Sequence, residues 1–543
     1  MATRIRSDAT GTLAAILVAV LMAPAKRGQQ TPILKARLLG VIGSALLICA
    51  TAAPAGATPE GTMTWGVHVT LAARWLDPAE TEALITPFMM LYAIHDALVK
   101  PMPAGINTPS LAESWTASKD GLSYEFVLRK VAKFHNGEPV TAEDVKFSFE
   151  RYKGSAAKLL KDKVKEIQAL DPGRVRFVLK EPWPDFMTFY GTSASGAGWI
   201  VPKKYVEKVG DDGFKKAPVG AGPFKVVSFT PGVELILEAF DGYWRKTPSV
   251  KRLVFRSMPE ETTRAAALKR GEADIVYLLS GPIAEDVKRT PNLKLIPSQP
   301  PGVFWLDFPD QWDPKSPWHD QRVRLAASLS VDRQAINQAE TLGFSRPTGS
   351  IIPRIFEFAL RIDPPAYNPK RAKQLLAEAG YPNGFDAGDF YPFPPYISMG
   401  EALAGYLQAV GIRTRIKTME RATFLSSWRE KKLHGLVVGI TGASGNAATR
   451  LEAYVTKGGI YSYGVLPEVE DLFQRQARET DPKRREALLH QIQRILHDQV
   501  RHAPIYELAF IWGVGPRVEE PGADLIKGFA YSGPYEDLRL KRQ

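Results

Sequence analysis

Short segments in which apolar and polar residues alternate recur along the chain, and this pattern predicts strands. Tyr124 to Leu128 alternates as a half-buried strand does, and the turn signal Asn136-Gly137 follows it. Four further segments favour strands, the last of them buried: Val175 to Leu179, Leu235 to Phe240, Leu253 to Arg256 and Ala273 to Leu278.

Helices are expected between these strands from the signals at their ends. Thr141 and Asp144 resemble a capping box, which predicts a helix running to about Tyr152. Asn368 is placed to cap a helix that has Pro369 at its first position. Two more helices are predicted, from about Thr262 to Arg270 and from Asp481-Pro482 onward. Strands and helices mixed over this length predict an α/β protein of several layers.

Length and composition support a large folded chain. The 543 residues are 45% hydrophobic, which predicts two to four lobes at about 150 residues per domain. The single cysteine excludes a disulfide framework, a zinc site built from cysteines and Cys-x-x-Cys redox chemistry.

The N-terminus has the pattern of an export signal. Leu13 to Ala23 and Leu38 to Ala53 are apolar, with basic residues between them, and Ala55-Gly56-Ala57 matches an Ala-x-Ala cleavage site. We expect residues 1–57 to be leader and signal peptide, the mature chain to start at Thr58 and the protein to be periplasmic. A two-helix membrane anchor is the alternative, although each run is shorter than the about 20 residues that a spanning helix needs.

Two details refine this picture of the leader. Ile48 precedes Cys49, where a lipidation site wants a small residue, so lipidation is not expected. Cleavage would lower the formal net charge from +12 to +7. Because the remaining excess is spread along the chain, a solvated surface is expected and no nucleic-acid partner.

Sequence motifs for catalysis are not found. The chain has no Gly-x-Ser-x-Gly, no His-Glu-x-x-His and no Gly-x-x-x-x-Gly-Lys. His490 and His497 lie two helical turns apart, which favours an ordinary amphipathic helix over a metal site. We therefore expect no enzyme, no metal and no cofactor.

A series of sequence blocks, in order over about residues 62–510, resembles one family. These blocks resemble the family 5 extracellular solute-binding proteins, the binding components of peptide/nickel-type ABC importers. They are Pro109 to Trp115, Asp120 to Phe126, Leu128-Arg129, Lys133 to Gly137, Thr141 to Ser148, Gly220 to Phe224, Asp241 to Trp244, Gly271 to Ile275, Asp320 to Ala326, Val331 to Arg333, Leu375 to Gly384 and Ala503 to Tyr506.

The resemblance implies a two-lobed type II periplasmic binding protein fold with an extra subdomain in lobe I. Lobe I would comprise residues 58–304, with the extra subdomain at about 101–217, and lobe II residues 305–504. Residues 505–543 would return to lobe I. The crossings, near Val303 to Phe308 and Ile505 to Ala509, would form a hinge.

The resemblance also implies a function. The protein would capture a peptide-like or other small solute between its lobes, as a monomer, and deliver it to an importer permease with its ATPase. The alternatives are a non-peptide solute (an opine, a sugar, a nickel chelate or haem), a secreted hydrolase, or a sensory binding module.

By position in the family pattern, seven residues are candidates for contact with the solute. They are Trp65, Tyr277, Trp305, Trp428, Thr441, Gly442 and Arg450. Core packing is the alternative for the large aromatic side chains. Arg450 could favour an acidic solute, with an exposed, solvated arginine as the alternative.

The glycine-rich segment Gly439 to Gly445 departs from the family pattern. Peptide binders typically carry a Gly-Trp-x-x-Asp-like segment here, whose aspartate pairs with the α-amino group of the peptide. This chain lacks both the tryptophan and the aspartate. A buried ammonium without such a partner would lose about 2–5 kcal/mol.

Overall fold

The computed structural model describes residues 58–80, 85–154, 156–191, 195–394, 396–441, 445–529 and 533–542. The predicted leader, its cleavage site and Cys49 lie outside these residues. Among the described helices, none combines the length and the apolar character that crossing a membrane requires.

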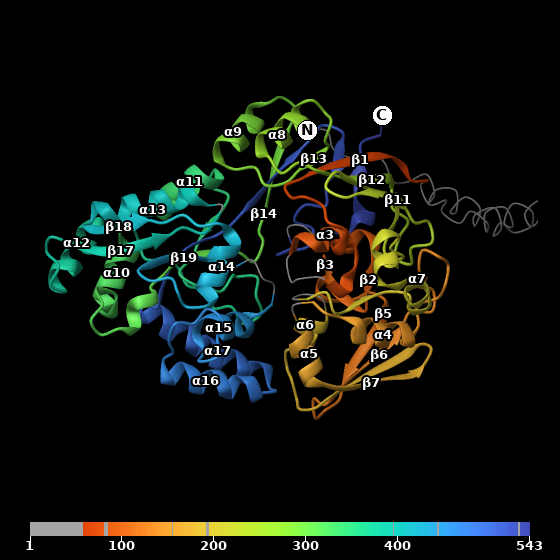
Figure 1. Ribbon diagram of the computed structural model, residues 1–543, viewed down its shortest axis with the longest axis horizontal. Helices are drawn as coiled ribbons and strands as arrows, with labels where there is room; N and C mark the ends of the chain where they lie inside the picture. Colours follow the sequence, from red (N-terminus) through yellow and green to blue (C-terminus); the bar gives the residue numbers. More distant parts are fainter. Residues whose placement is uncertain are drawn as a thin grey trace, which may run out of the picture. The chain divides into compact units, whose positions relative to one another are not determined.

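A seven-stranded sheet forms the core of what we call the first-sheet region, residues 58–80, 224–298 and 510–542 (Figure 1). The strand order is β10 (Phe224–Thr230), β11 (Glu234–Ala239), β12 (Val250–Ser257), β1 (Glu60–Val67), β13 (Ile275–Val276), β21 (Phe510–Val514) and β14 (Lys294–Ser298). β1 is parallel to β12 and β13, and the remaining pairs are antiparallel. Helices α8 (Glu261–Lys269) and α9 (Gly281–Arg289) belong to this region, and α3 (Ile85–Ile94) contributes to its hydrophobic core.

A six-stranded sheet forms the second-sheet region, residues 303–507. Its strand order is β16 (Arg346–Pro347), β20 (His502–Glu507), β15 (Val303–Asp307), β19 (Leu436–Thr441), β17 (Phe385–Tyr391) and β18 (Ile412–Ile416). Its helices are α10 (Gln321–Leu329), α11 (Arg333–Thr341), α12 (Pro369–Glu378), α13 (Ile397–Ala409), α14 (Arg421–Arg429), α15 (Ala447–Val455), α16 (Pro467–Arg478) and α17 (Pro482–Asp498).

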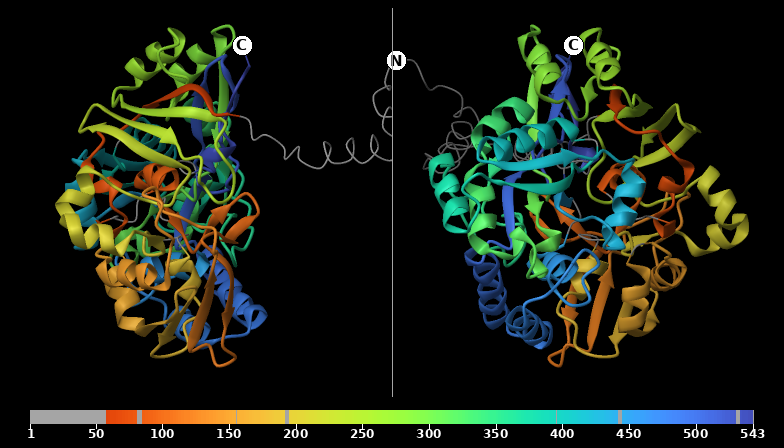
Figure 2. Two further views of the ribbon diagram at one scale, coloured as in Figure 1. Left: turned by 90° about the vertical axis from the view of Figure 1, so that its right-hand side faces the viewer. Right: turned by 60° about the vertical axis from the view of Figure 1, so that its left-hand side comes forward.

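A smaller four-stranded sheet has a hydrophobic core of its own. We call residues 112–216 the four-stranded region; it is drawn in orange to yellow in Figure 2. The sheet order is β5 (Ala112–Ala117), β6 (Ser123–Leu128), β8 (Arg174–Leu179) and β7 (Val164–Asp171), with helices α4 (Ala142–Arg151), α5 (Ala157–Lys163), α6 (Phe186–Tyr190) and α7 (Lys203–Lys216). Three short pairs complete the strands: β2 (Asp96–Ala97) with β9 (Trp199–Ile200), β3 (Val99–Met102) with β4 (Gly105–Pro109), and β22 (Val518–Glu520) with β23 (Arg539–Leu540).

Local end signals confirm the predicted helices. Thr141 and Asp144 form the capping box of α4. The side chains of Asn368 and Asp481 accept backbone N–H bonds at the N-termini of α12 and α17, each with a proline at the first position. These caps satisfy donors that have no partner inside the helix, which is why the helices begin there.

The predicted strand from Ala273 to Leu278 is wrong in length. The observed strand, β13, contains only Ile275 and Val276, which pair with β1 and β21. Asp274, at its start, accepts hydrogen bonds from the backbone N–H of Thr64 at 2.9 Å and from Arg517. Leu278, at its end, has a positive φ of 50°. The Asp274 and Tyr277 N–H groups still donate to the Thr64 and Gly66 carbonyl oxygens of β1, and the left-handed turn at Leu278 ends the pairing.

The first-sheet and four-stranded regions meet at the turn before β10. A Cβ at Gly220 would lie 2.0 Å from the Ile94 carbonyl oxygen, so only glycine allows this approach. The Gly220 N–H donates to His135 Nδ1 at 3.2 Å, and His135 Nε2 lies 3.0 Å from the Gly222 carbonyl oxygen. A neutral imidazole satisfies both bonds at once. Burial lowers the pKa of His135 to about 3.

The chain passes twice between the two larger sheets. Residues 299–302 join β14 to β15, and residues 508–509 join β20 to β21. The two links are bonded to each other, because the Leu508 N–H donates to the Gly302 carbonyl oxygen at 2.9 Å. Val303 to Asp307 and His502 to Glu507 are strands inside the second sheet.

Candidate functional site

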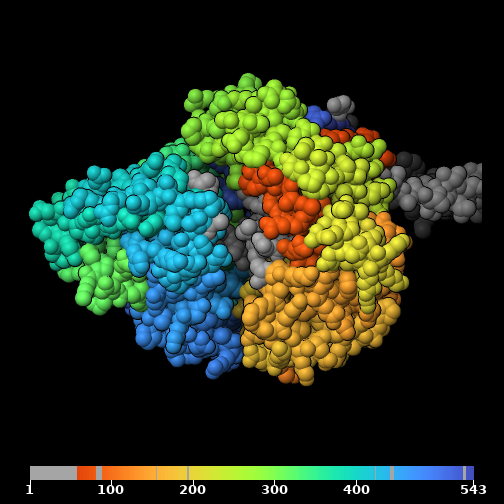
Figure 3. Space-filling view, in the orientation of Figure 1, coloured from red at the N-terminus to blue at the C-terminus, as the bar shows by residue number. Residues whose placement is uncertain are grey.

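The candidate site lies where the first-sheet and four-stranded regions face the second-sheet region. In Figure 3 the blue surface of the second-sheet region borders the orange surface of the four-stranded region. The two links between the sheets, residues 299–302 and 508–509, are the covalent connections between these parts.

Trp65 and Tyr277 lie together in the core of the first-sheet region. Trp65 lies on β1 and Tyr277 directly follows β13, a strand that pairs with β1. Their ring centroids are 5.3 Å apart, and Trp512 lies at 5.5 Å from Trp65 and 4.8 Å from Tyr277. Both side chains are buried. Aromatic packing accounts for the pair, and contact with a solute stays a prediction.

Trp305 and Trp428 form the corresponding cluster of the second-sheet region. Their ring centroids are 6.3 Å apart, and the Tyr454 ring lies within 6 Å of both. A Cβ on Gly439 of β19 would lie 2.3 Å from the Trp305 ring, so that glycine gives the indole its place against the sheet. Both indoles are fully buried. The structure therefore brings the four predicted aromatic residues together as two pairs, one in each sheet region.

The glycine-rich segment connects β19 to α15. Thr441 is the last residue of β19, and Gly442 lies outside the described residues. Asn446 ends the segment and caps α15, because its side chain accepts the Thr449 N–H at 3.0 Å. The cap fixes the point at which the predicted binding segment rejoins the fold.

The alternative of an exposed Arg450 is wrong, because its side chain is only 3% exposed. Nη1 donates to the Ile351 carbonyl oxygen at 3.0 Å and Nη2 to that of Pro301 at 3.1 Å. The guanidinium lies 5.1 Å from the centroid of the Phe356 ring. Burial lowers the pKa of Arg450 to about 10, so the side chain is charged at neutral pH. Arg450 thus ties α15 to one of the two links between the sheets.

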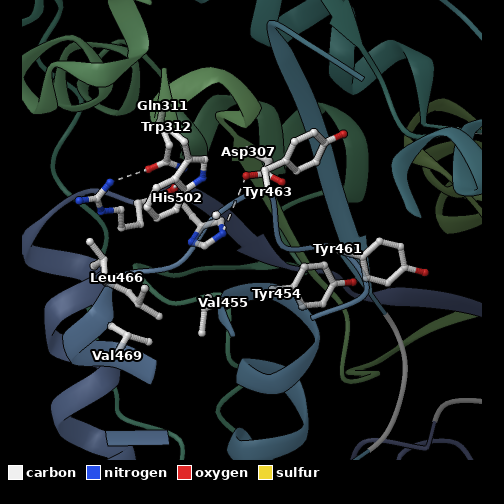
Figure 4. A pocket seen from close by; sticks show the side chains of 13 residues that line it. Asp307, Gln311, Trp312, Tyr454, Val455, Tyr461, Tyr463, Leu466, Val469 and His502 are labelled. Atoms are coloured by element: carbon white, nitrogen blue, oxygen red, sulfur yellow. Dashed lines mark hydrogen bonds and ion pairs between the residues drawn. The ribbon is translucent and has the colours of Figure 1, made fainter. Parts of the chain in front are cut away.

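A separate pocket lies between the second sheet and helices α15 to α17 (Figure 4). Its space, open solvent included, is about 380 Å³. Asp307 Oδ1 and His502 Nε2 are 3.9 Å apart in its wall. Burial raises the pKa of Asp307 to about 7 and lowers that of His502 to about 3. The remaining wall is largely aromatic and aliphatic, including Trp312, Tyr454, Tyr461, Tyr463, Leu466, Val469 and Leu496.

Sequence reasoning did not find this pocket, because Asp307 and His502 are far apart along the chain and neither lies in a motif. Among the described residues, no group of three or more His, Cys, Asp or Glu side chains is placed to hold a metal ion.

Two sheet regions joined by two links define a two-lobed binding protein. Residues 108–462 match the family described as bacterial extracellular solute-binding proteins, family 5 Middle. The chain belongs to this family.

Relatives and a solved structure share most of this length. Heme-binding protein A of Haemophilus influenzae is 28% identical over 76% of this chain and 81% of its own. The dipeptide-binding protein of Escherichia coli K12 is 27% identical over 74% of this chain and 81% of its own. The Helicobacter pylori periplasmic binding protein DppA, solved in complex with the peptide STSA, is 25% identical with a TM-score of 0.71; the match covers 89% of this chain and 98% of that one. The two-lobed periplasmic binding protein fold predicted from the sequence is confirmed.

Proposed function

We propose that this protein is the periplasmic solute-binding component of an ABC importer. The observation that carries the proposal is a match to a solute-binding family over residues 108–462, in a chain whose two sheet regions are joined by two short links. A solute that contacts both lobes stabilises the closed state by its greater affinity for that state. The closed form would deliver the solute to a membrane permease and its ATPase. The protein would carry out no chemistry on the solute.

The predicted domain boundaries follow from the same proposal. Lobe I would be residues 58–304 with the return at 505–543, lobe II residues 305–504, and the extra subdomain about 101–217. The four-stranded sheet, with its own hydrophobic core, supports the idea of a separate subdomain. The export signal in residues 1–57 fits a protein that captures its solute outside the inner membrane.

A peptide-like or other small solute is the leading candidate, and a non-peptide solute is the second. The relatives include a dipeptide-binding and a heme-binding protein, so family membership alone supports both candidates. The sequence of the glycine-rich segment favours the second candidate, because it lacks the aspartate that pairs with a peptide's amino group. The candidate contacts remain Trp65, Tyr277, Trp305, Trp428, Thr441, Gly442 and Arg450, of which the four aromatic residues and Arg450 are buried in this structure.

The first test is native mass spectrometry of the protein purified without denaturation from the periplasm of its host, followed by identification of the released molecule. A stoichiometric peptide would support the leading candidate and would mean that another group replaces the missing aspartate. A stoichiometric opine, sugar, nickel chelate or haem would support the second. A protein that returns no bound molecule and binds none from a screen of these classes would contradict solute capture.

A further inference from the structure

Asp185 belongs to the four-stranded region, but its side chain makes polar contacts with the second-sheet region. It lies directly before α6, and its two carboxylate oxygens accept hydrogen bonds from two residues of the second-sheet region. Asn446 Nδ2 donates to Oδ1 at 2.6 Å, and Arg485 Nη2 donates to Oδ2 at 2.6 Å. The Asp185 and Arg485 side chains are 14% and 5% exposed. The contact therefore joins groups 261 and 300 residues apart in the chain, largely out of water.

Both partners of Asp185 are also held by contacts within the second-sheet region. Asn446 uses its side-chain oxygen to cap α15, which leaves its amide nitrogen to donate outward. Arg485, on α17, donates from Nε to Gln476 Oε1 at 3.0 Å, and its guanidinium lies 5.4 Å from the Phe358 ring centroid. The opposite region thus meets a prearranged pair of donors, which lowers the entropy lost on contact.

The carboxylates around this contact make the positive charge of Arg485 necessary for it. Burial raises the pKa of Glu357 and of Glu452, and the negative charge of Asp185 adds to both shifts. The field of Arg485 opposes the shift at Glu357. Asp185 therefore approaches a surface of the second-sheet region that carries carboxylates, and the guanidinium is the cation that makes the approach favourable.

We propose that Asp185, Asn446 and Arg485 form a closure latch that sets the open–closed equilibrium of the protein before any solute is bound. The latch is polar and its groups regain water when it opens, so it is reversible in a way that an apolar contact is not. It lies on the α6, α15 and α17 side, whereas α8 and α9 lie at the opposite end of the view in Figure 1. The inference rests on the proposed function only for its consequence, a contribution to solute affinity.

The test measures the separation of the two lobes without any solute. Lys158 on α5 and Arg475 on α16 are 88% and 60% exposed and carry the labels after Lys158→Cys and Arg475→Cys substitution. Cys49, the only cysteine of the chain, is replaced by serine in this background. Single-molecule energy transfer on the dialysed full chain then gives the ratio of open to closed molecules.

Asp185→Asn is expected to raise the open-to-closed ratio about tenfold, because a charge-assisted hydrogen bond is lost while the side-chain shape is kept. Arg485→Gln is expected to raise it further, because it leaves the facing carboxylates without their cation. The double variant Asp185→Asn with Arg485→Gln is expected to be no more open than Arg485→Gln alone, since the two residues act through one contact. Asp171→Asn is the matched control: Asp171 is in the same region and pairs with Arg174 at 2.7 Å within that region.

An open-to-closed ratio that is the same in Asp185→Asn and in the parent overturns the latch. So does an equal shift in Asp171→Asn, because the effect would then be general to the charge of the region. Additive effects in the double variant overturn it as well. Since no solute is present, these outcomes are independent of whether the protein captures one, which the mass spectrometry tests separately.

Discussion

Two buried arginines of the second-sheet region share a setting and differ in where their hydrogen bonds go. Arg450 lies over the ring of Phe356 and Arg485 over that of Phe358, at 5.1 and 5.4 Å. Arg450 donates to two main-chain carbonyl oxygens, those of Ile351 and Pro301. Arg485 donates to a carboxylate of the four-stranded region, that of Asp185.

The difference shows that a buried arginine can belong either to a permanent core contact or to a contact that forms and breaks. The Ile351 carbonyl bonded to Arg450 lies in the same region and the Pro301 carbonyl in one of the links, so breaking these bonds leaves buried polar groups without partners. The contact of Arg485 with Asp185 depends on the two regions being together, and water replaces each partner when they separate. Burial alone therefore does not reveal whether an arginine belongs to a core or to a moving contact.

We take burial to fix the charge state of a side chain. Acid offers the largest test of that assumption, because it protonates buried histidines. Burial lowers the pKa of His135 to about 3 and that of His95 to about 4. In the unfolded chain a histidine takes up its proton near pH 6.5, so the stability that the neutral form contributes is present above pH 6.5 and is lost as the pH falls toward 4. At pH 5 the loss is about 2 kcal/mol for each of these histidines.

Urea unfolding between pH 7.5 and 5 measures this loss. His135→Asn keeps a neutral acceptor for the Gly220 N–H, and we expect a shallower decline of the unfolding free energy in this variant. His434→Gln, at a side chain that is 70% exposed and lies 2.7 Å from Asp310, is the comparison for the loss of an exposed histidine. Asp307 acts in the opposite direction, because burial raises its pKa to about 7. A parent protein whose histidines titrate near pH 6.5 would contradict the assumption.

Local signals made the helices predictable, because caps act within one turn of the chain. Thr141 with Asp144, Asn368 and Asp481 each satisfy backbone N–H groups two or three residues away, so sequence patterns alone locate these helix ends. The family resemblance supplied the two-lobed fold, since blocks in the same order require the same arrangement of elements. The end of β13 was missed because Leu278 has a positive φ, a conformation that apolar residues rarely adopt.

The parts of the candidate site that escaped prediction depend on tertiary contacts. Arg450 could have been exposed or buried, and only the position of the Pro301 carbonyl beside it decides between these. No sequence pattern distinguishes Asp185 from other residues before a short helix, and its partner Arg485 is 300 residues away. The sequence does not show that these residues meet.

A substitution at Arg450 gives the next largest effect. Arg450→Ala is expected to lower the unfolding free energy by about 3 kcal/mol, because two buried carbonyl oxygens lose their donor and the Phe356 ring loses its contact. Chemical denaturation measures the loss, and Arg475→Ala, at an exposed position of α16, is the control expected within about 0.5 kcal/mol of the parent. Unchanged stability with weakened binding of the identified solute would instead make Arg450 a solute contact.

Salt has the smallest expected effect, a change in the open-to-closed ratio, and it distinguishes the roles of the two arginines most directly. The screening length falls from about 10 Å at 0.1 M to about 3 Å at 1 M salt. Salt therefore stabilises the separated, solvent-exposed charges of the open state relative to the buried ion pair, while bonds to carbonyls in a core are unaffected. We expect sodium chloride to raise the open-to-closed ratio of the parent about twofold over this range. In Arg485→Gln the sign should reverse, because Asp185 then faces Glu357 and Glu452 and screening reduces their repulsion. Energy transfer between the labels on α5 and α16 measures both responses, and the same direction of shift in the two proteins would mean that the charge of Arg485 does not hold the regions together.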